Sequence, residues 1–235
     1  RDLVRSRGLG DVYKRQIMFS YYFDPTYVLV IIAFLLTLFA SMGVKSTFSK
    51  YNDVRSSRGI TAASAARQIL DANGLQNIRI EHVSGDLTDH YSPNENVIRL
   101  SDSTYNSTSV AAIGVAAHEC GHAVQHQVGY VPIKIRNGIV PIVNVCNTLS
   151  MPIFIIGLIL GLGRLAMVGA ILFGAVLVFQ LVTLPTEINA SRRAMKTLES
   201  MYLLEGDELT GARKTLTAAA MTYLSLIHIS EPTRP

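Results

Sequence analysis

The chain has 235 residues, of which 49% are hydrophobic and 16% are charged, and its mean hydropathy is +0.30. About 25% of the residues in a soluble domain are normally charged, so this composition favours a membrane protein over an ordinary soluble domain. The formal charge of +4 comes mainly from the chain ends: without residues 1–16 and 225–235, 15 basic and 14 acidic residues remain. We therefore expect no nucleic-acid partner.

The two ends differ in composition and pattern from the sequence between them. Residues 1–16 and 225–235 resemble translated sequencing-adapter read-through, so we treat both as non-native tails and exclude them from the fold. On this interpretation the native chain starts at Met18 and its native C-terminus is missing.

The first apolar segment, residues 27–44, contains no charged residue and has about 18 residues, the minimum for a transmembrane helix. A cleaved signal peptide is the alternative. The preceding stretch from Met18 to Thr26 lacks the basic region of a signal peptide, and no clear A-x-A cleavage site follows. We predict a membrane anchor at residues 27–44.

Residues 45–137 are predicted to form a lobe outside the membrane. Thr61 is suited to cap a helix with a regular apolar face, and Gly74 is suited to end it. Residues 77–83 alternate between apolar and polar side chains, which predicts a strand. The pattern of residues 96–101 predicts a second strand, which we expect at the edge of a small sheet.

A long helix is predicted to start after Ser107 or Ser109 and to continue through about His126. It contains an HExxH motif, whose histidines are His118 and His122. Residues four apart lie on one face of a helix, so both imidazoles can reach a single Zn²⁺ at about 2.0–2.1 Å. The alternative is an exposed helix face with two ordinary histidines.

The glutamate of the motif, Glu119, follows the first histidine directly. A carboxylate at this position can take the proton of a water that the zinc activates. Such a base has no purpose in a purely structural metal site. The sequence therefore predicts Glu119 as a catalytic residue.

A second apolar block, residues 148–184, is too long for a single membrane crossing and is interrupted near its middle by Gly161, Gly163 and Arg164. We predict two membrane helices, at 148–163 and 165–184, joined by a tight turn. Residues 215–224 are predicted to begin a further membrane helix that the C-terminal tail truncates. The fold expected is α+β, a mainly helical membrane protein with three such helices and natively a fourth.

A catalytic zinc takes three protein ligands, so the motif needs one more. No HExxHxxGxxH pattern is present, because Val128 occupies the place of its last histidine. Glu187 is the best candidate. It follows the third apolar segment, where an unpaired acid is costly. It also lies on a helix predicted over residues 185–214, with Pro185 in the first turn. The alternative is a surface glutamate beside two arginines.

Four segments of the chain together resemble the YugP-like membrane zinc metallopeptidases. In chain order these segments are Val44–Phe48, Leu87–Tyr91, Gly114–His126 and Leu184–Ala194. The resemblance covers roughly residues 18–224. It implies a zincin-like catalytic lobe that carries one zinc ion per chain.

This family is similar to the HtpX and CAAX-protease group of zincins, in which a Glu-x-x-Ala-Asp segment follows HExxH. The resemblance implies that Glu187 is the third zinc ligand and that Ala190 is the alanine of that segment. Ser191 stands where the group has aspartate. A supporting carboxylate is therefore not expected at this position.

Other polar residues carry weaker predictions. Cys120 should point away from the metal, and the two cysteines form no CxxC pair. His126 is expected to serve in packing or capping, with orientation of a ligand as the alternative. His90 and Tyr91 are both candidate donors to a tetrahedral oxyanion, and the same holds for Asn189.

The topology must return the chain to one side of the membrane between His122 and Glu187, and two spans satisfy this requirement. Basic residues flank the predicted spans on the side of the lobe, which places the lobe in the cytoplasm. These residues are Lys45, Lys50, Arg55, Arg58, Lys134, Arg136, Arg192, Arg193 and Lys196.

The sequence thus predicts a membrane-bound zinc endopeptidase, integral to a bacterial cell membrane. Its partners would be the lipid bilayer and a peptide or membrane-protein substrate, which could pair with the strand at 96–101. The alternatives are an intramembrane protease and a non-catalytic metal-binding scaffold. The former needs an aspartate in a later span, and residues 148–184 contain none. No sequence feature indicates an oligomeric state.

Overall fold

A computed structural model describes residues 25–222, so the predicted tails at 1–16 and 225–235 and the start at Met18 lie outside the described residues. The elements are α2 (Pro25–Asn52), α3 (Ala62–Ala72), β1 (Arg79–Val83), β2 (His90–Ser92), β3 (Val97–Ser101), α4 (Val110–Gln127), α5 (Val131–Ile159), α6 (Gly163–Ser200) and α7 (Gly206–Thr222).

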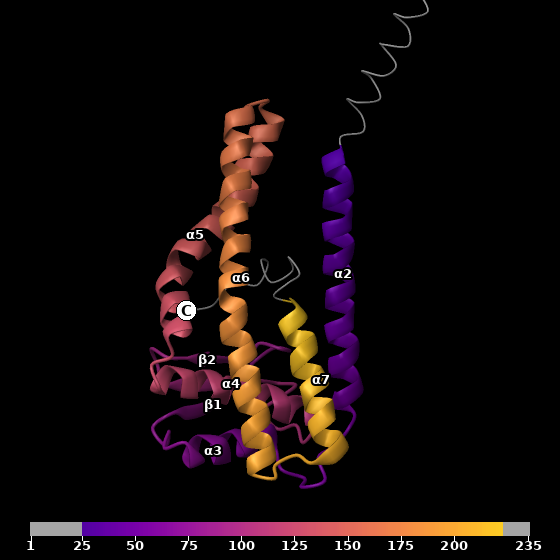
Figure 1. The fold of residues 1–235 in the computed structure, drawn as a ribbon, viewed down its shortest axis with the longest axis vertical. Coiled ribbons are helices and arrows are strands. Elements are labelled where there is room, and N and C mark those ends of the chain that lie inside the picture. Colours follow the sequence, from indigo (N-terminus) through magenta and orange to yellow (C-terminus); the bar gives the residue numbers. More distant parts are fainter. Residues whose placement is uncertain (1–24, 223–235) are drawn as a thin grey trace, which may run out of the picture.

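The elements form a lobe and a set of long helices that leave it (Figure 1). The lobe contains α3, α4, the three strands, α7 and the C-terminal half of α6. The α5–α6 hairpin and α2 extend from the lobe in the same direction (Figure 1). This arrangement is the one expected of a lobe that rests on a membrane.

The first helix of the lobe, α3, forms as its sequence predicts. The Thr61 side chain accepts a hydrogen bond from the Ser64 backbone N–H, which satisfies one of the free donors of the first turn. Gly74 has φ +73°, a conformation that favours glycine, and the chain turns there. The predicted apolar face is buried and consists of Ala62, Ala65, Ala66, Ile69 and Leu70.

The sheet has the strand order β1-β3-β2, so the prediction that residues 96–101 form an edge strand is wrong. β3 pairs parallel with β1 and antiparallel with β2. Val97, Ile98 and Leu100 are all fully buried, which suits a central strand. β2 has only three residues, too few to give a recognisable pattern in the sequence.

The HExxH helix, α4, starts after Ser109, whose side chain accepts a hydrogen bond from the Ala112 N–H. Ser107 is not the cap, and its hydroxyl donates to the Ser109 hydroxyl instead. α4 lies in the middle of the lobe, in contact with α3, α6 and α7. Most of its residues are therefore buried, including both the small apolar ones and the HExxH glutamate.

Within residues 25–222, α5 and α6 are the two helices that are long and apolar enough to cross a membrane. The predicted span at 165–184 lies within α6, but the predicted span at 148–163 runs past the end of α5 at Ile159 and through the turn. Both helices extend far beyond the predicted spans at their other ends, because both continue into the lobe. Gly161, with φ +65°, lies in the turn between them. Gly169 allows close packing, since a Cβ there would lie 2.6 Å from the Phe154 backbone nitrogen. Pro185 lies inside α6 and does not begin a new helix, contrary to prediction.

The lobe is larger than the predicted range of residues 45–137. Its apolar core also contains Leu198, Leu203 and Leu204 from the end of α6 and the following turn, and Leu216 from α7. These segments belong to the lobe because the buried face of α4 needs apolar partners on several sides.

The two remaining membrane predictions concern α2 and α7. The segment at 27–44 lies within α2, and its function as an anchor stays a prediction. α7 starts at Gly206 and packs against α2 and α4. Part of the segment at 215–224 is therefore buried in the lobe, and residues 223–224 lie outside the described residues.

Asp89 connects the loop before β2 to the end of β3. Its carboxylate accepts hydrogen bonds from the Ser101 N–H at 2.8 Å, the Ser101 hydroxyl at 3.0 Å and the Thr104 hydroxyl at 3.1 Å. Burial raises the pKa of the Asp89 carboxyl, and the hydrogen bonds from Ser101 and Thr104 oppose this rise.

Asp89→Ala is expected to lower the free energy of unfolding by about 1–3 kcal/mol, because it leaves buried donors of Ser101 and Thr104 without an acceptor. Thermal unfolding in detergent measures this loss. Asp86→Ala, at a nearby exposed position, is the control and should change stability by less than about 0.5 kcal/mol. Equal stability of the two variants would contradict the structural role of Asp89.

Candidate metal centre

Two helices supply the candidate ligands. His118 and His122 lie one turn apart on α4, and Glu187 lies on α6. The helices approach closely at Gly121, where a Cβ would lie only 2.6 Å from the Ala190 carbonyl oxygen. Only a glycine at this position allows α6 to present Glu187 to both histidines.

The three side chains converge on one carboxylate oxygen. Glu187 Oε2 lies 3.2 Å from His118 Nε2 and 3.3 Å from His122 Nε2. Three ligand atoms, one from each residue, lie within 4.8 Å of one another. Tetrahedral zinc with bonds of about 2.0–2.1 Å places its ligand atoms about 3.3–3.4 Å apart. The two separations measured from Glu187 Oε2 therefore match the spacing of ligand atoms around zinc.

The second carboxylate oxygen of Glu187, Oε1, also indicates a metal site. The side chain is 2% exposed, and Oε1 has no hydrogen-bond partner within the described residues. The nearest cation is Arg136, whose Nη2 lies 3.6 Å away, beyond normal hydrogen-bond distance. A buried carboxylate with an unsatisfied oxygen is costly, and a bound cation would offset that cost.

Hydrogen bonds fix the orientation of both imidazoles. His118 Nδ1 lies 3.0 Å from the Ser191 hydroxyl, and His122 Nδ1 lies 3.0 Å from Gln125 Oε1. If each Nδ1 carries the proton and donates, each Nε2 is free to bind a metal. Ser191 thus holds the His118 ring through its hydroxyl group.

Gln125 also joins the two ligand-bearing helices. Its amide nitrogen donates to the Thr186 carbonyl at 2.8 Å and to Asn189 Oδ1 at 3.0 Å. Sequence reasoning missed this role and that of Arg136. The available signal was the spacing of Gln125, which follows the candidate ligand His122 by three residues on the same helix.

Glu119 is 9% exposed and next to the first histidine. Burial raises the pKa of its carboxyl to about 7. The charge of His118 opposes this rise, those of Asp89 and Glu187 add to it, and that of Arg136 again opposes it. A carboxyl with this pKa can accept a proton and return it near neutral pH.

Cys120 lies on the far side of α4 from the ligands, as predicted. Its thiol donates a weak hydrogen bond to the Ala66 carbonyl on α3 at 3.6 Å. Burial raises the pKa of the thiol, which keeps it protonated and unreactive.

The other predicted polar residues lie on α4, β2 and α6. His126 packs edge-on against the Tyr91 ring, with 6.1 Å between the ring centroids, which supports the packing interpretation. His90 Nδ1 lies 2.9 Å from the Thr88 carbonyl oxygen, to which it can donate. Asn189 accepts from Gln125 and from Arg193, so it has a structural role. An oxyanion donor among His90 and Tyr91 stays a prediction.

Two histidines one helical turn apart and a buried carboxylate on a second helix define the type of metal centre on which zinc peptidases depend. The chain belongs to the family described as "Putative neutral zinc metallopeptidase", whose model matches residues 26–230. This finding confirms the resemblance drawn from the sequence motifs.

A curated relative is the "Putative membrane protease YugP" of Bacillus subtilis (strain 168). It is 45% identical over 202 residues, which are 86% of this chain and 90% of the relative. No solved structure matches the chain.

Gly121→Ala should destabilise the protein, because the added methyl group forces α4 and α6 apart. Overpacking of this kind costs about 1–3 kcal/mol, while alanine's higher helix propensity returns up to about 1 kcal/mol. Thermal unfolding should show a lower melting temperature, and zinc titration should show a lower affinity for zinc. The control is Gly114→Ala on the same helix, where the new Cβ meets Ala212 Cβ at an ordinary 3.4 Å. A Gly121 variant as stable as this control would refute the close approach.

Ser191→Ala should weaken zinc binding about 10- to 100-fold, because His118 loses the partner that orients its ring. A competition titration with a chelating dye measures this change. Ser191→Asp should retain the affinity, since a carboxylate also accepts from Nδ1. Ser200→Ala, at an exposed position on α6, is the matched control. Unchanged affinity in Ser191→Ala would exclude the orienting role.

Proposed function

We propose that the chain is a membrane-bound, zinc-dependent endopeptidase with a zincin-like lobe. The observation that carries this proposal is the convergence of His118, His122 and Glu187 at the spacing of zinc ligands, with Glu119 buried beside them. Family membership and the membrane protease relative support it. One zinc ion per chain would be held by these three side chains.

A zinc ion held by these residues would polarise the carbonyl of the scissile peptide bond and lower the pKa of a water to about 7. Glu119 removes a proton from the attacking water and later returns it to the leaving amine. Its burial suits both steps, because a pKa near 7 allows transfer in either direction. Ser191 and Gln125 keep the two imidazoles oriented throughout.

The membrane arrangement follows from the helices that leave the lobe. In this proposal the α5–α6 hairpin, whose two helices are long and apolar enough to span a membrane, crosses it twice, and α2 anchors the N-terminal side. Bases flank the spans on the side of the lobe, and this asymmetry supports a lobe that faces the bacterial cytoplasm. Because Glu187 lies three residues after the predicted span, the substrates would be peptide segments near the membrane surface, including those of membrane proteins.

The decisive experiment measures bound zinc and peptide hydrolysis in purified full-length protein and two variants. Wild type should hold one zinc. Glu187→Gln, which preserves the side-chain volume, should lose most of the zinc because one ligand is replaced by a neutral amide. Glu119→Gln should keep the zinc and lose hydrolysis, since only the base is removed. Glu205→Gln, at an exposed position in the turn between α6 and α7, is the control for both measurements.

The losses of zinc and of hydrolysis in these proteins distinguish a metallopeptidase from a metal-binding scaffold. A zinc-free wild type would remove the metallopeptidase proposal. A Glu119→Gln variant that hydrolyses as fast as wild type would leave a metal site without this catalytic base, as in a metal-binding scaffold. Full zinc occupancy in Glu187→Gln would exclude Glu187 as the third ligand.

A further inference from the structure

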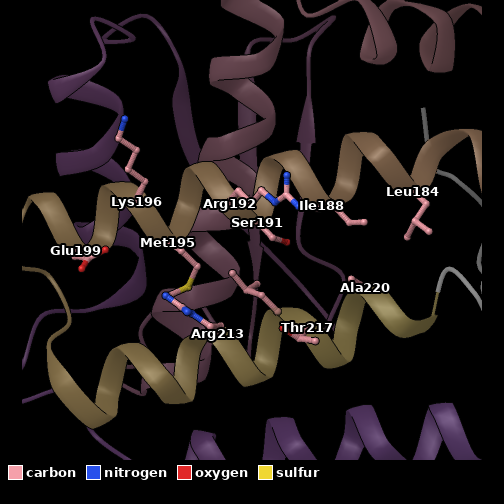
Figure 2. Close-up of a pocket in the computed structure, with 11 residues that line it drawn as sticks. Leu184, Ile188, Ser191, Arg192, Met195, Lys196, Glu199, Arg213, Thr217 and Ala220 are labelled. Carbon is pink, nitrogen blue, oxygen red and sulfur yellow. The ribbon is translucent and has the colours of Figure 1, made fainter.

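A cavity of about 590 Å³ lies between α6 and α7, apart from the HExxH residues. Figure 2 shows its walls: one row of side chains comes from α6 and the other from α7. Ser191, whose hydroxyl contacts His118, forms part of the α6 wall. The cavity therefore adjoins the metal centre through one shared residue.

One end of this cavity is apolar. Leu184 and Ile188 from α6 and Ala220 from α7 line it (Figure 2). Leu184 is the last residue of the predicted third membrane span, so in the membrane arrangement proposed above, on which this inference rests, this end lies at the membrane boundary. An apolar cavity that opens there suits a hydrocarbon chain.

The other part of the cavity is basic. Arg192 and Lys196 on α6 and Arg213 on α7 line it, against a single acid, Glu199. Figure 2 shows the Arg213 side chain directed from α7 towards Met195 on α6. The structure records no ion pair for any of these three bases within residues 25–222. Their charges are available to an anionic ligand.

We propose that this cavity binds an anionic phospholipid from the membrane leaflet that faces the lobe. An acyl chain would lie along Leu184, Ile188 and Ala220, and the headgroup phosphate would bind Arg192 and Arg213. Basic pockets between helices at a membrane surface bind anionic headgroups in this way. A soluble anion would leave the apolar part unfilled, and a neutral lipid would leave the bases unpaired.

The test uses purified full-length protein, delipidated in neutral detergent, and phosphatidylglycerol with a photoreactive group on its acyl chain. Photolysis and peptide mapping should place the label on α6 and α7 near Leu184 and Ala220. Unlabelled phosphatidylglycerol should compete for the site, while phosphatidylcholine and glycerol phosphate should compete at least tenfold more weakly. These two competitors separate headgroup charge from acyl-chain binding.

Separate variants test the basic part and the apolar end of the cavity. Arg192→Gln together with Arg213→Gln should weaken phosphatidylglycerol binding roughly 25-fold, since each base near a membrane surface contributes a factor of about five. Ala220→Trp should also reduce labelling by filling the apolar end. Lys214→Gln, an exposed base next to Arg213 that does not line the cavity, should bind like wild type. Circular dichroism establishes that each variant is folded.

Three results would overturn the proposal. One is equal labelling with phosphatidylglycerol and phosphatidylcholine competitors, which would show that charge is irrelevant. Another is full competition by glycerol phosphate, which would indicate a simple anion site. The third is unchanged binding in the folded Arg192 and Arg213 double variant. None of these measurements depends on hydrolysis, so the outcome is independent of the proposed peptidase activity.

Discussion

The close contact between α4 and α6 at Gly121 is the constraint on which the metal centre depends. Because no side chain separates the helices there, the Ala190 backbone lies against α4 and Glu187, three residues earlier, faces both histidines. Gln125 strengthens the same contact through the Thr186 carbonyl and the Asn189 side chain. The geometry of the ligands is therefore a property of helix packing, and the lobe around α4 exists largely to hold that packing.

The helix α6 connects the apolar hairpin to the candidate metal centre. Its first part packs against α5 in the apolar hairpin, and its last part belongs to the core of the lobe. Pro185 lies between these parts without ending the helix. One continuous helix therefore carries the ligand, so any movement of the hairpin against the lobe would change the position of Glu187. The position of Glu187 is therefore coupled to the packing of the hairpin.

The two sides of α6 serve different chemistry. The side towards α4 carries a buried carboxylate that needs a cation, and the side towards α7 carries bases around an apolar cavity. The carboxylate that needs a cation and the bases that need an anion thus lie on opposite sides of one helix. Ser191 lies between them, since it orients His118 and also lines the cavity. Occupancy of the cavity and order in the metal centre are consequently expected to be linked.

The sequence by itself determined the local features: the Thr61 cap, the buried face of α3, the HExxH helix, and the apolar stretches of α5 and α6. These depend on neighbouring residues and periodicity, which a single sequence displays. It also indicated Glu187, because an acid directly after a membrane span needs a partner. Only the tertiary structure decided that β3 is central, that α6 passes through Pro185, and that Gln125 and Ser191 orient the histidines. The physical reason is that these features depend on contacts between segments far apart in the chain, which no local pattern encodes.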